Sequence, residues 1–225
     1  MNKLTLLFAF FSTSVFSASA QEVKIDSNYA NSHYLQRMEF FSKMPHRKNE
    51  IVFLGNSITE HGEWQELIPD KPVINRGIGG DNTFGLLARV DEIVAAKPKT
   101  IFLLIGINDL ARKLPYEVIL KNYRRIISKI RTGSPRTTLY IQSILPLNSS
   151  MTKAPYLEGR NPMQIELNKR LKELCREEGL TYIDLHPLFE DENQELKKEL
   201  SIDGIHLKAS AYIMWVNYLK KMKYL

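Results

Sequence analysis

Short apolar runs alternate along this chain with longer segments in which apolar residues recur every three or four positions. The short runs predict strands buried on both faces, at 51–54, 73–75, 100–105, 138–144 and 180–184. The periodic segments predict amphipathic helices, at 28–43, 83–95, 115–131, 161–178 and 208–221. This alternation is typical of α/β proteins. We therefore expect a five-stranded parallel sheet between two layers of helices, a three-layer α/β/α sandwich.

Residues at the ends of the predicted helices support these boundaries. Asp81 or Asn82 is suited to cap the helix that begins at residue 83. Asn161 and Pro162 suit the cap and first turn of the helix over 161–178, and Gly179 suits its C-terminal end.

The N-terminal segment has the pattern of a signal peptide. Lys3 gives it a positive start, an apolar run covers 4–11, and Ala18-Ser19-Ala20 has the small residues that precede a cleavage site. A membrane span needs roughly 20 apolar residues, and neither this run nor any later stretch reaches that length. We expect cleavage after Ala20, one domain over 21–225, and an exported protein, periplasmic or secreted, without a membrane span. A buried N-terminal helix is the alternative.

Composition narrows the function classes. With 225 residues, 44% hydrophobic and 25% charged, the chain has the composition of a soluble globular domain rather than of a disordered or fibrous protein. The net charge of +6 comes from scattered basic residues without a basic stripe interleaved with aromatics, so we expect no nucleic-acid partner. The single cysteine, Cys175, excludes a disulfide framework and a cysteine-built zinc site.

Four short polar blocks, 55–59, 75–81, 106–109 and 203–206, lie after the first three predicted strands and before the last helix. Taken singly, each block has an ordinary interpretation as a turn or a helix cap. The glycine-rich block 75–81 also suggests a phosphate-binding loop, but its glycines do not have the G-x-G-x-x-G spacing. Because parallel strands end at one edge of the sheet, the first three blocks are expected to lie close together.

Together the blocks contain the groups that acyl transfer needs. Ser57 is a candidate nucleophile in a strand-to-helix turn, and the Asn108 side chain is a candidate donor to an oxyanion. Asp203 lies three residues before His206, so its carboxylate can orient the imidazole and leave the second ring nitrogen as a base.

In this order, the blocks resemble those of the SGNH, or GDSL-like, hydrolases. The resemblance covers most of the chain from residue 51 onward and points to the branch similar to platelet-activating-factor acetylhydrolase and bacterial carbohydrate acetylesterases. It implies a flavodoxin-like topology, with Ser57 as nucleophile, His206 as base and Asp203 as its partner. It also implies an oxyanion hole formed by the N–H groups of Ser57 and Gly80 and the Asn108 side chain, with no metal or cofactor.

Two positions depart from the family pattern. The first block reads Gly-Asn-Ser-Ile-Thr, so Asn56 stands where the family usually has aspartate. Asn56 can still form neutral hydrogen bonds, and this form is familiar in the acetylesterase-like branch. Gly79 stands where that branch often has serine, which we expect to widen the pocket floor.

The resemblance implies a short-chain acyl ester as substrate, with O-acetyl carbohydrate first and a lysophospholipid or short-chain lipid ester second. A non-catalytic carbohydrate-binding protein on the same fold, or a partner-binding subunit, is the alternative from another class. Candidate substrate contacts are His61, Trp64, Arg76 and Arg112, each of which also has a structural interpretation. The segment 146–160 is either a substrate-binding loop or an ordinary long loop, and the sequence carries no signal for oligomeric state.

Overall fold

The computed structural model describes residues 25–157 and 159–225, so the predicted signal peptide lies outside the described residues. Its sheet has five strands in the order β2-β1-β3-β4-β5, and every neighbouring pair is parallel. This is the flavodoxin-like order, and it confirms the predicted fold class. The strands are β1 (Ile51–Gly55), β2 (Val73–Gly77), β3 (Thr100–Leu104), β4 (Thr138–Gln142) and β5 (Thr181–Ile183).

The long helices lie where the apolar periodicity predicts them. They are α1 (Ser32–Lys43), α4 (Thr83–Ala95), α6 (Tyr116–Gly133), α7 (Asn161–Glu177) and α9 (Ala209–Lys221). The structure adds short helices that span too few residues for a periodic pattern. These are α2 (Ser57–Glu60), α3 (Trp64–Leu67), α5 (Ile107–Ala111) and α8 (His186–Phe189), with 3₁₀ turns η1 (Pro155–Leu157) and η2 (Lys198–Leu200).

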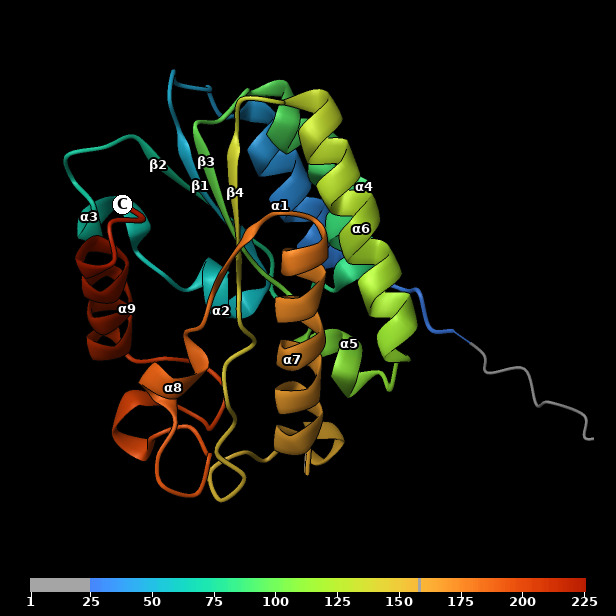
Figure 1. Ribbon diagram of the computed structural model, residues 1–225, viewed down its shortest axis with the longest axis vertical. Coiled ribbons are helices and arrows are strands. Elements are labelled where there is room, and N and C mark those ends of the chain that lie inside the picture. The colour runs from blue at the N-terminus through green and yellow to red at the C-terminus, as the bar shows by residue number, and fades with distance from the viewer. Residues whose placement is uncertain (1–24, 158) are drawn as a thin grey trace, which may run out of the picture.

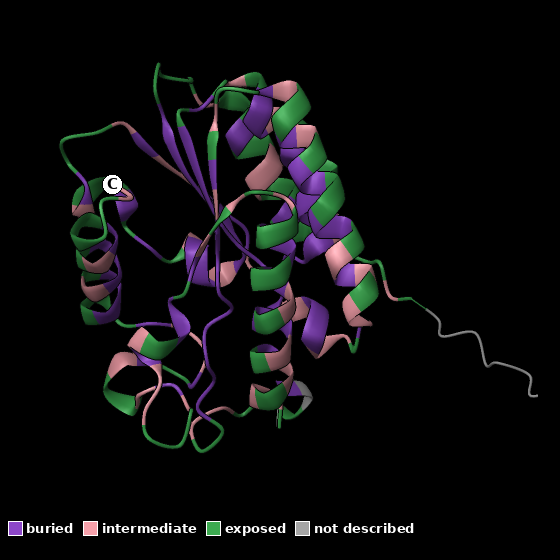
Figure 2. Cartoon of the chain, in the orientation of Figure 1, coloured by how far each residue is buried: buried purple, intermediate pink, exposed green. Residues whose placement is uncertain are grey.

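The sheet separates two apolar cores, and successive strand residues alternate between them. Figure 1 shows α4 and α6 on one side of the strands and α3 and α9 on the other. Val52, Leu54 and Leu103 face the core formed with α4, α6 and α7. Phe53 and Leu104 face the core formed with α3, α8 and α9. Because both faces are covered, the central strands β1 and β3 are buried throughout, as Figure 2 shows.

The helix ends decide between the predicted caps. Asn82 is the cap of α4, because its side chain accepts from the N–H groups of Phe84 and Gly85. The predicted cap at Asn161 is wrong: this residue is already helical, and its side chain both donates to and accepts from the backbone of Leu147. Asn161 therefore holds the loop after β4 rather than the end of its own helix.

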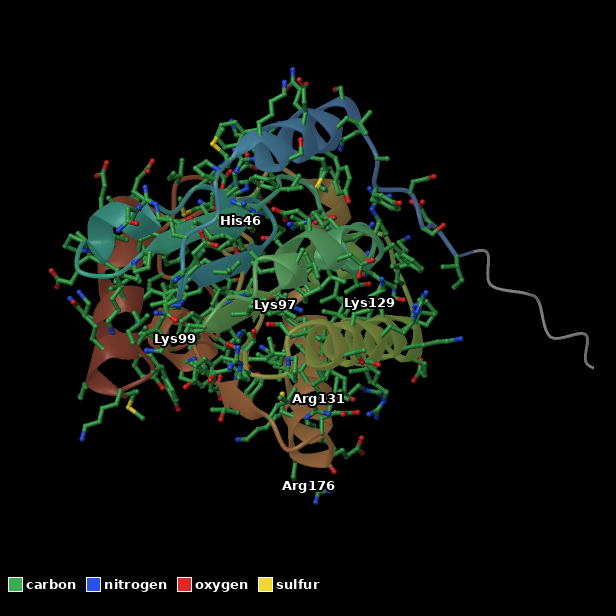
Figure 3. The ribbon with its side chains drawn as sticks, turned by 90° about the horizontal axis from the view of Figure 1, so that it is seen from above. His46, Lys97, Lys99, Lys129, Arg131 and Arg176 are labelled. Carbon is green, nitrogen blue, oxygen red and sulfur yellow. The ribbon has the colours of Figure 1, made fainter. Side chains whose placement is uncertain are left out.

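Exposed basic side chains are spread over several elements. Figure 3 shows Lys129, Arg131 and Arg176 pointing outward from α6 and α7. Each pairs with an acidic neighbour: Lys129 with Asp91, Arg131 with Glu178, and Arg176 with Glu173. These cations are parts of solvated, ion-paired helix faces. Over the described residues, the helices are all too short or too polar to cross a lipid bilayer.

Candidate active site

Ser57 lies at the carboxyl end of the central strand β1, in a tight turn. The strand ends at Gly55, the Asn56 side chain accepts from the N–H of Ile58 at 3.0 Å, and α2 begins at Ser57. A Cβ atom on Gly55 would lie 2.2 Å from the carbonyl oxygen of Leu104 in β3. Glycine is therefore required at residue 55 for the turn to lie against the neighbouring strand, and Asn56 fills the aspartate position as a neutral cap.

His206 connects Ser57 to Asp203 in a continuous line of hydrogen bonds. Its Nε2 lies 3.0 Å from the Ser57 Oγ, and its Nδ1 lies 2.7 Å from Asp203 Oδ2. A carboxylate only accepts hydrogen bonds, so Nδ1 carries the proton and Nε2 is left to accept from the serine hydroxyl. The structure thus brings the serine to a histidine that lies 149 positions later in the sequence.

The acid and the base are held by one short loop. Ser201 and Leu207 form an antiparallel bridge at its base, and the Ser201 hydroxyl bonds to Gly204 N–H and the His206 carbonyl. Asp203 Oδ1 accepts from the N–H groups of Ile205 and His206, at 2.9 and 2.8 Å. The backbone of the loop therefore fixes the orientation of the Asp203 carboxylate independently of its bond to the imidazole.

Opposing effects act on the pKa of Asp203. Partial burial acts to raise it, but the hydrogen bonds from the His206 ring and from the N–H groups of His206 and Ile205 outweigh burial. The net result is a pKa below the usual value, so Asp203 is ionised at neutral pH. An ionised carboxylate in this position can stabilise a positive charge on the His206 ring.

Three N–H donors are available where an oxyanion would form. Over residues 25–157 and 159–225, neither the N–H of Ser57 nor that of Gly80 donates a hydrogen bond within the chain. Gly80 has φ of +76°, a conformation that favours glycine. The Asn108 side chain donates one N–H to the Asp81 carbonyl at 2.8 Å, which leaves its second N–H free.

Buried polar contacts hold these donors in place. Asp81 pairs with Arg89 at 2.9 Å, and the same guanidinium donates to the carbonyls of Arg76 and Gly55. Asp109, beside Asn108, accepts from both the N–H and the hydroxyl of Thr83 at the start of α4. Burial raises the pKa of Asp109 to about 7, even though the bonds from Thr83 act to lower it.

Of the four predicted substrate contacts, His61 is the one beside the base. Its ring centre lies 4.9 Å from that of His206. Burial lowers the pKa of His61, and the neighbouring His206 lowers it further. His61 is therefore neutral at physiological pH and offers a polar ring edge next to His206.

The structure places Trp64 and Arg76 elsewhere, so the expectation that they contact substrate is corrected. Trp64 is buried, stacks on Phe53 at 3.8 Å between ring centres, and donates to the Thr59 carbonyl. The Arg76 side chain is 4% exposed and pairs with Glu92. Both side chains belong to the packed interior, because proximity to Ser57 or to a strand end does not determine where a side chain points.

Arg112 lies at the rim of a hollow that does not include Ser57, Asp203 or His206. Its guanidinium pairs with Asp26 at 2.8 Å and lines the hollow together with residues 27–31. The Arg112 guanidinium is therefore paired with the N-terminal segment before α1.

The segment after β4 forms one wall of a hollow beside the acid and the base. Residues 151–155 line it on one side and residues of the 202–206 loop on the other, and its volume is about 600 Å³. The two walls are packed together, because Asn148 N–H donates to the Gly204 carbonyl and a Cβ on Gly204 would lie 2.6 Å from the Asn148 carbonyl oxygen. The 146–160 segment thus borders the candidate active site.

The site also contains residues that sequence reasoning missed. Glu60 lies at the end of α2, and its carboxylate contacts the Gly79 N–H and two side chains of α1, His33 and Arg37. The expectation of a wider pocket floor at Gly79 is corrected, because Glu60 and His33 fill the space that a Cβ there would enter. The only sequence signal was the position of Glu60, three residues after Ser57. In the described part of the chain, no three His, Cys, Asp or Glu side chains gather as a metal site would require.

Comparison with known proteins shows the family of this chain. The model of the GDSL-like Lipase/Acylhydrolase family matches residues 53–212, from β1 into α9. The chain belongs to this family. It is therefore a carboxylic ester hydrolase by family, acting on a small-molecule ester.

Several proteins of known name or structure are similar to this chain over most of their length. The platelet-activating factor acetylhydrolase IB subunit alpha1 of Bos taurus is 23% identical, over 85% of this chain and 81% of its own. A Streptococcus pneumonia structure named for platelet activating factor is 30% identical, with a TM-score of 0.75, covering 84% of this chain and 90% of its own. An acetylxylan esterase structure from Geobacillus stearothermophilus is 16% identical, with a TM-score of 0.63 and coverages of 79% and 95%. At that identity the last likeness shows the fold alone.

Proposed function

We propose that this GDSL-like protein hydrolyses short-chain acyl esters, O-acetyl esters of carbohydrates above all, with Ser57 as nucleophile. The observation that carries the proposal is the hydrogen-bonded line from Asp203 through His206 to Ser57. A base within hydrogen-bond reach of a serine, itself oriented by a carboxylate, is the arrangement that activates a serine hydroxyl.

The proposed reaction has two halves. In the first, His206 Nε2 takes the Ser57 proton as Oγ attacks the ester carbonyl, and the tetrahedral intermediate then expels the alcohol, which takes the proton back from His206. In the second, His206 takes a proton from water as the water oxygen attacks the acyl-enzyme. Collapse of the second intermediate releases the acid and restores Ser57.

The oxyanion of each intermediate would be bound by the N–H groups of Ser57 and Gly80 and the free N–H of Asn108. All three donors already lack another partner within the described chain, so accepting the oxyanion costs no existing hydrogen bond. Donors aligned in advance supply a large part of the rate enhancement in acyl transfer.

Two relatives bear on the substrate. An acetylxylan esterase has this fold, and the curated relatives are named as acetylhydrolases. Both names refer to the acetyl group, which fits a short acyl chain. The carbohydrate assignment follows the acetylxylan esterase. A lipid acetyl ester is the second candidate, because Met151, Ile202 and Ile205 give the hollow beside His206 an apolar side.

The proposal is tested by hydrolysis of p-nitrophenyl acetate, butyrate and octanoate by the wild-type protein and the Ser57→Ala variant. We expect Ser57-dependent turnover that falls as the acyl chain lengthens, together with Ser57-dependent labelling by a fluorophosphonate. Acetylated xylooligosaccharides and an acetylated phospholipid then compete as substrates, and preference for the phospholipid would select the second candidate. Absence of both turnover and labelling would refute the esterase proposal and favour a carbohydrate-binding protein on this fold.

We also propose that the chain is exported and cleaved after Ala20. The charged start, apolar run and Ala-Ser-Ala sequence support this. Mass spectrometry of the protein from cell and extracytoplasmic fractions tests it. A mature N-terminus at Gln21 outside the cytoplasm is expected, and an intact N-terminus inside the cell would contradict it.

A further inference from the structure

Glu60 makes contacts that the proposed triad and oxyanion hole do not explain. It lies on α2, one turn after Ser57, and its side chain is 14% exposed. Its Oε2 accepts from the Gly79 N–H at 2.5 Å, next to the proposed oxyanion donor Gly80. On the other side, His33 Nε2 lies 3.0 Å from Oε2, and Arg37 Nε lies 3.1 Å from Oε1. One carboxylate thus joins the nucleophile helix, the oxyanion loop (residues 77–80) and α1.

Helix α1 holds the carboxylate from a fixed position. Arg37 Nη2 donates to the Gly77 carbonyl at the start of the oxyanion loop, while its guanidinium carbon lies 4.7 Å from the centre of the buried Phe41 ring. Tyr34 of the same helix donates to the Gly85 carbonyl in α4. Because α1 is fixed to the body of the domain, Arg37 and His33 meet Glu60 from an anchored helix.

Ile78 anchors the first half of the oxyanion loop, because its side chain is buried in a cluster with Tyr34 and Phe41 of α1 and its N–H donates to the Gly55 carbonyl. Gly79 and Gly80 both lack a Cβ, so the backbone between them has wide conformational freedom. Glycine is needed at residue 77 for close approach, since a Cβ there would lie 2.1 Å from the Glu60 nitrogen. A Cβ on Gly79 would lie 3.1 Å from Glu60 Oε2, which requires only a small shift of the carboxylate. The loop thus lies against α2, and beyond the anchored Ile78 it is the Glu60 side chain that binds the backbone at Gly79.

Adjacent N–H groups of this loop have different partners. The Gly79 N–H is bound by Glu60, whereas the Gly80 N–H has no partner within the described chain. Binding the first N–H restricts rotation of the peptide that precedes Gly79, and so restricts the direction in which the Gly80 N–H points. Arg37 also offsets the negative charge of Glu60, which would otherwise repel an oxyanion.

We infer that Glu60 is a positioning residue that holds the Gly79–Gly80 segment so that the Gly80 N–H faces the oxyanion. The inference rests on the proposed function of Ser57. Glu60 acts through its acceptor oxygen, and α1 acts by holding the carboxylate.

The experiment compares Glu60→Leu, which removes the acceptor, with Glu60→Gln, which keeps an acceptor oxygen but removes the charge. Glu63→Gln is the matched control, because Glu63 is exposed and its side chain caps nothing. Misplacement of a catalytic group by ~1 Å can cost ~10²-fold in rate. We expect Glu60→Leu to lower kcat on p-nitrophenyl acetate about 10- to 100-fold, with KM changed less than about 3-fold. Glu60→Gln should stay within about 5-fold of wild type, and Glu63→Gln should be unchanged.

Two further readouts separate positioning from a general structural role. Phenylboronic acid forms a bond with the serine oxygen and becomes a tetrahedral anion that resembles the proposed intermediate. If the Gly80 N–H is misplaced in Glu60→Leu, the inhibition constant should rise by about the same factor as kcat falls. Amide hydrogen exchange at residues 77–80 should be faster in Glu60→Leu, with exchange in β1 and β3 unchanged. This second readout does not require turnover.

The possible failures are distinguishable. Wild-type protein without Ser57-dependent turnover would overturn the proposed function, and the exchange measurement would still decide whether Glu60 holds the loop. Active wild type with unchanged kcat in Glu60→Leu, or unchanged exchange at residues 77–80, would overturn the inference alone. Equal losses in Glu60→Gln and Glu60→Leu would overturn the acceptor role, since the charge would then be the property that matters.

Discussion

Replacement of Asp109 by asparagine should change how the stability of the protein depends on pH. The Asp109 carboxyl group is fully buried and its pKa is raised to about 7, from an ordinary value of 3.8. Between pH 4 and 7 the folded chain therefore keeps a proton that the unfolded chain has released. The stabilisation is present below pH 4 and is lost as pH rises towards 7, because an ionised carboxylate is costly in this site.

The pKa values set the size of the effect. A rise of about 3 pKa units at ~1.36 kcal/mol each corresponds to about 4 kcal/mol of unfolding free energy. The asparagine side chain cannot ionise, and its oxygen can still accept from Thr83. The free energy of unfolding of Asp109→Asn, minus that of wild type, should therefore increase by about 4 kcal/mol between pH 4 and pH 8.

Urea denaturation of both proteins at four or five pH values measures this difference. Other carboxyl groups titrate in both proteins and cancel in the subtraction. Asp91→Asn is the control, because Asp91 is exposed and pairs with Lys129 on the surface; a surface ion pair is worth at most ~1 kcal/mol, so its difference from wild type should stay within that range. A difference for Asp109→Asn that stays constant over the pH range would refute the claim that Asp109 is protonated in the folded chain.

The remaining predictions concern the donors, the buried ion pair and the acid. Asn108→Ala should lower kcat about 10²- to 10³-fold through loss of one oxyanion donor, and a wild-type kcat would remove Asn108 from the oxyanion hole. Arg89→Met should destabilise the protein by about 3–5 kcal/mol in urea, because Asp81 is left charged and buried, whereas the exposed pair probed by Arg131→Met should be worth at most ~1 kcal/mol. Asp203→Asn should lower kcat about 10³- to 10⁴-fold with little change in melting temperature, since His206 loses its orienting acceptor. Full activity in this variant would contradict the proposed role.

The fold was largely predictable because its elements differ in period and length. The central strands are buried on both faces and read as unbroken apolar runs, while α4, α6 and α7 bury one stripe each. Helices of four or five residues escaped prediction, since a single turn cannot display a period. The cap at Asn161 was misassigned because an asparagine before a proline suits a helix start, whereas here its amide is drawn to the Leu147 backbone.

At the candidate site, prediction worked where chemistry follows from spacing along the chain. The Asp203–His206 pair lies in a local turn, so four consecutive residues of sequence contain it. Arg76 and Trp64 were misjudged because alternation along β2 and packing against Phe53 decide which way they point. Glu60 was missed because its partners His33 and Arg37 on α1 lie 27 and 23 positions earlier. No local sequence pattern indicates that residues so far apart in the chain are in contact.

The location of His206, 149 positions after Ser57, affects when the proposed esterase can begin to work. Ser57 is synthesised early, yet its partner is brought to it by the segment leading into α9. That helix is secured by Tyr212 bonding to the Ile58 carbonyl and by Trp215 bonding to Gln142. A nascent chain still emerging from the ribosome or crossing a membrane therefore carries an unactivated serine. Ester hydrolysis would begin only after the segment through α9 has been synthesised and has packed against β1 and α2, so folding of this late segment would switch the activity on.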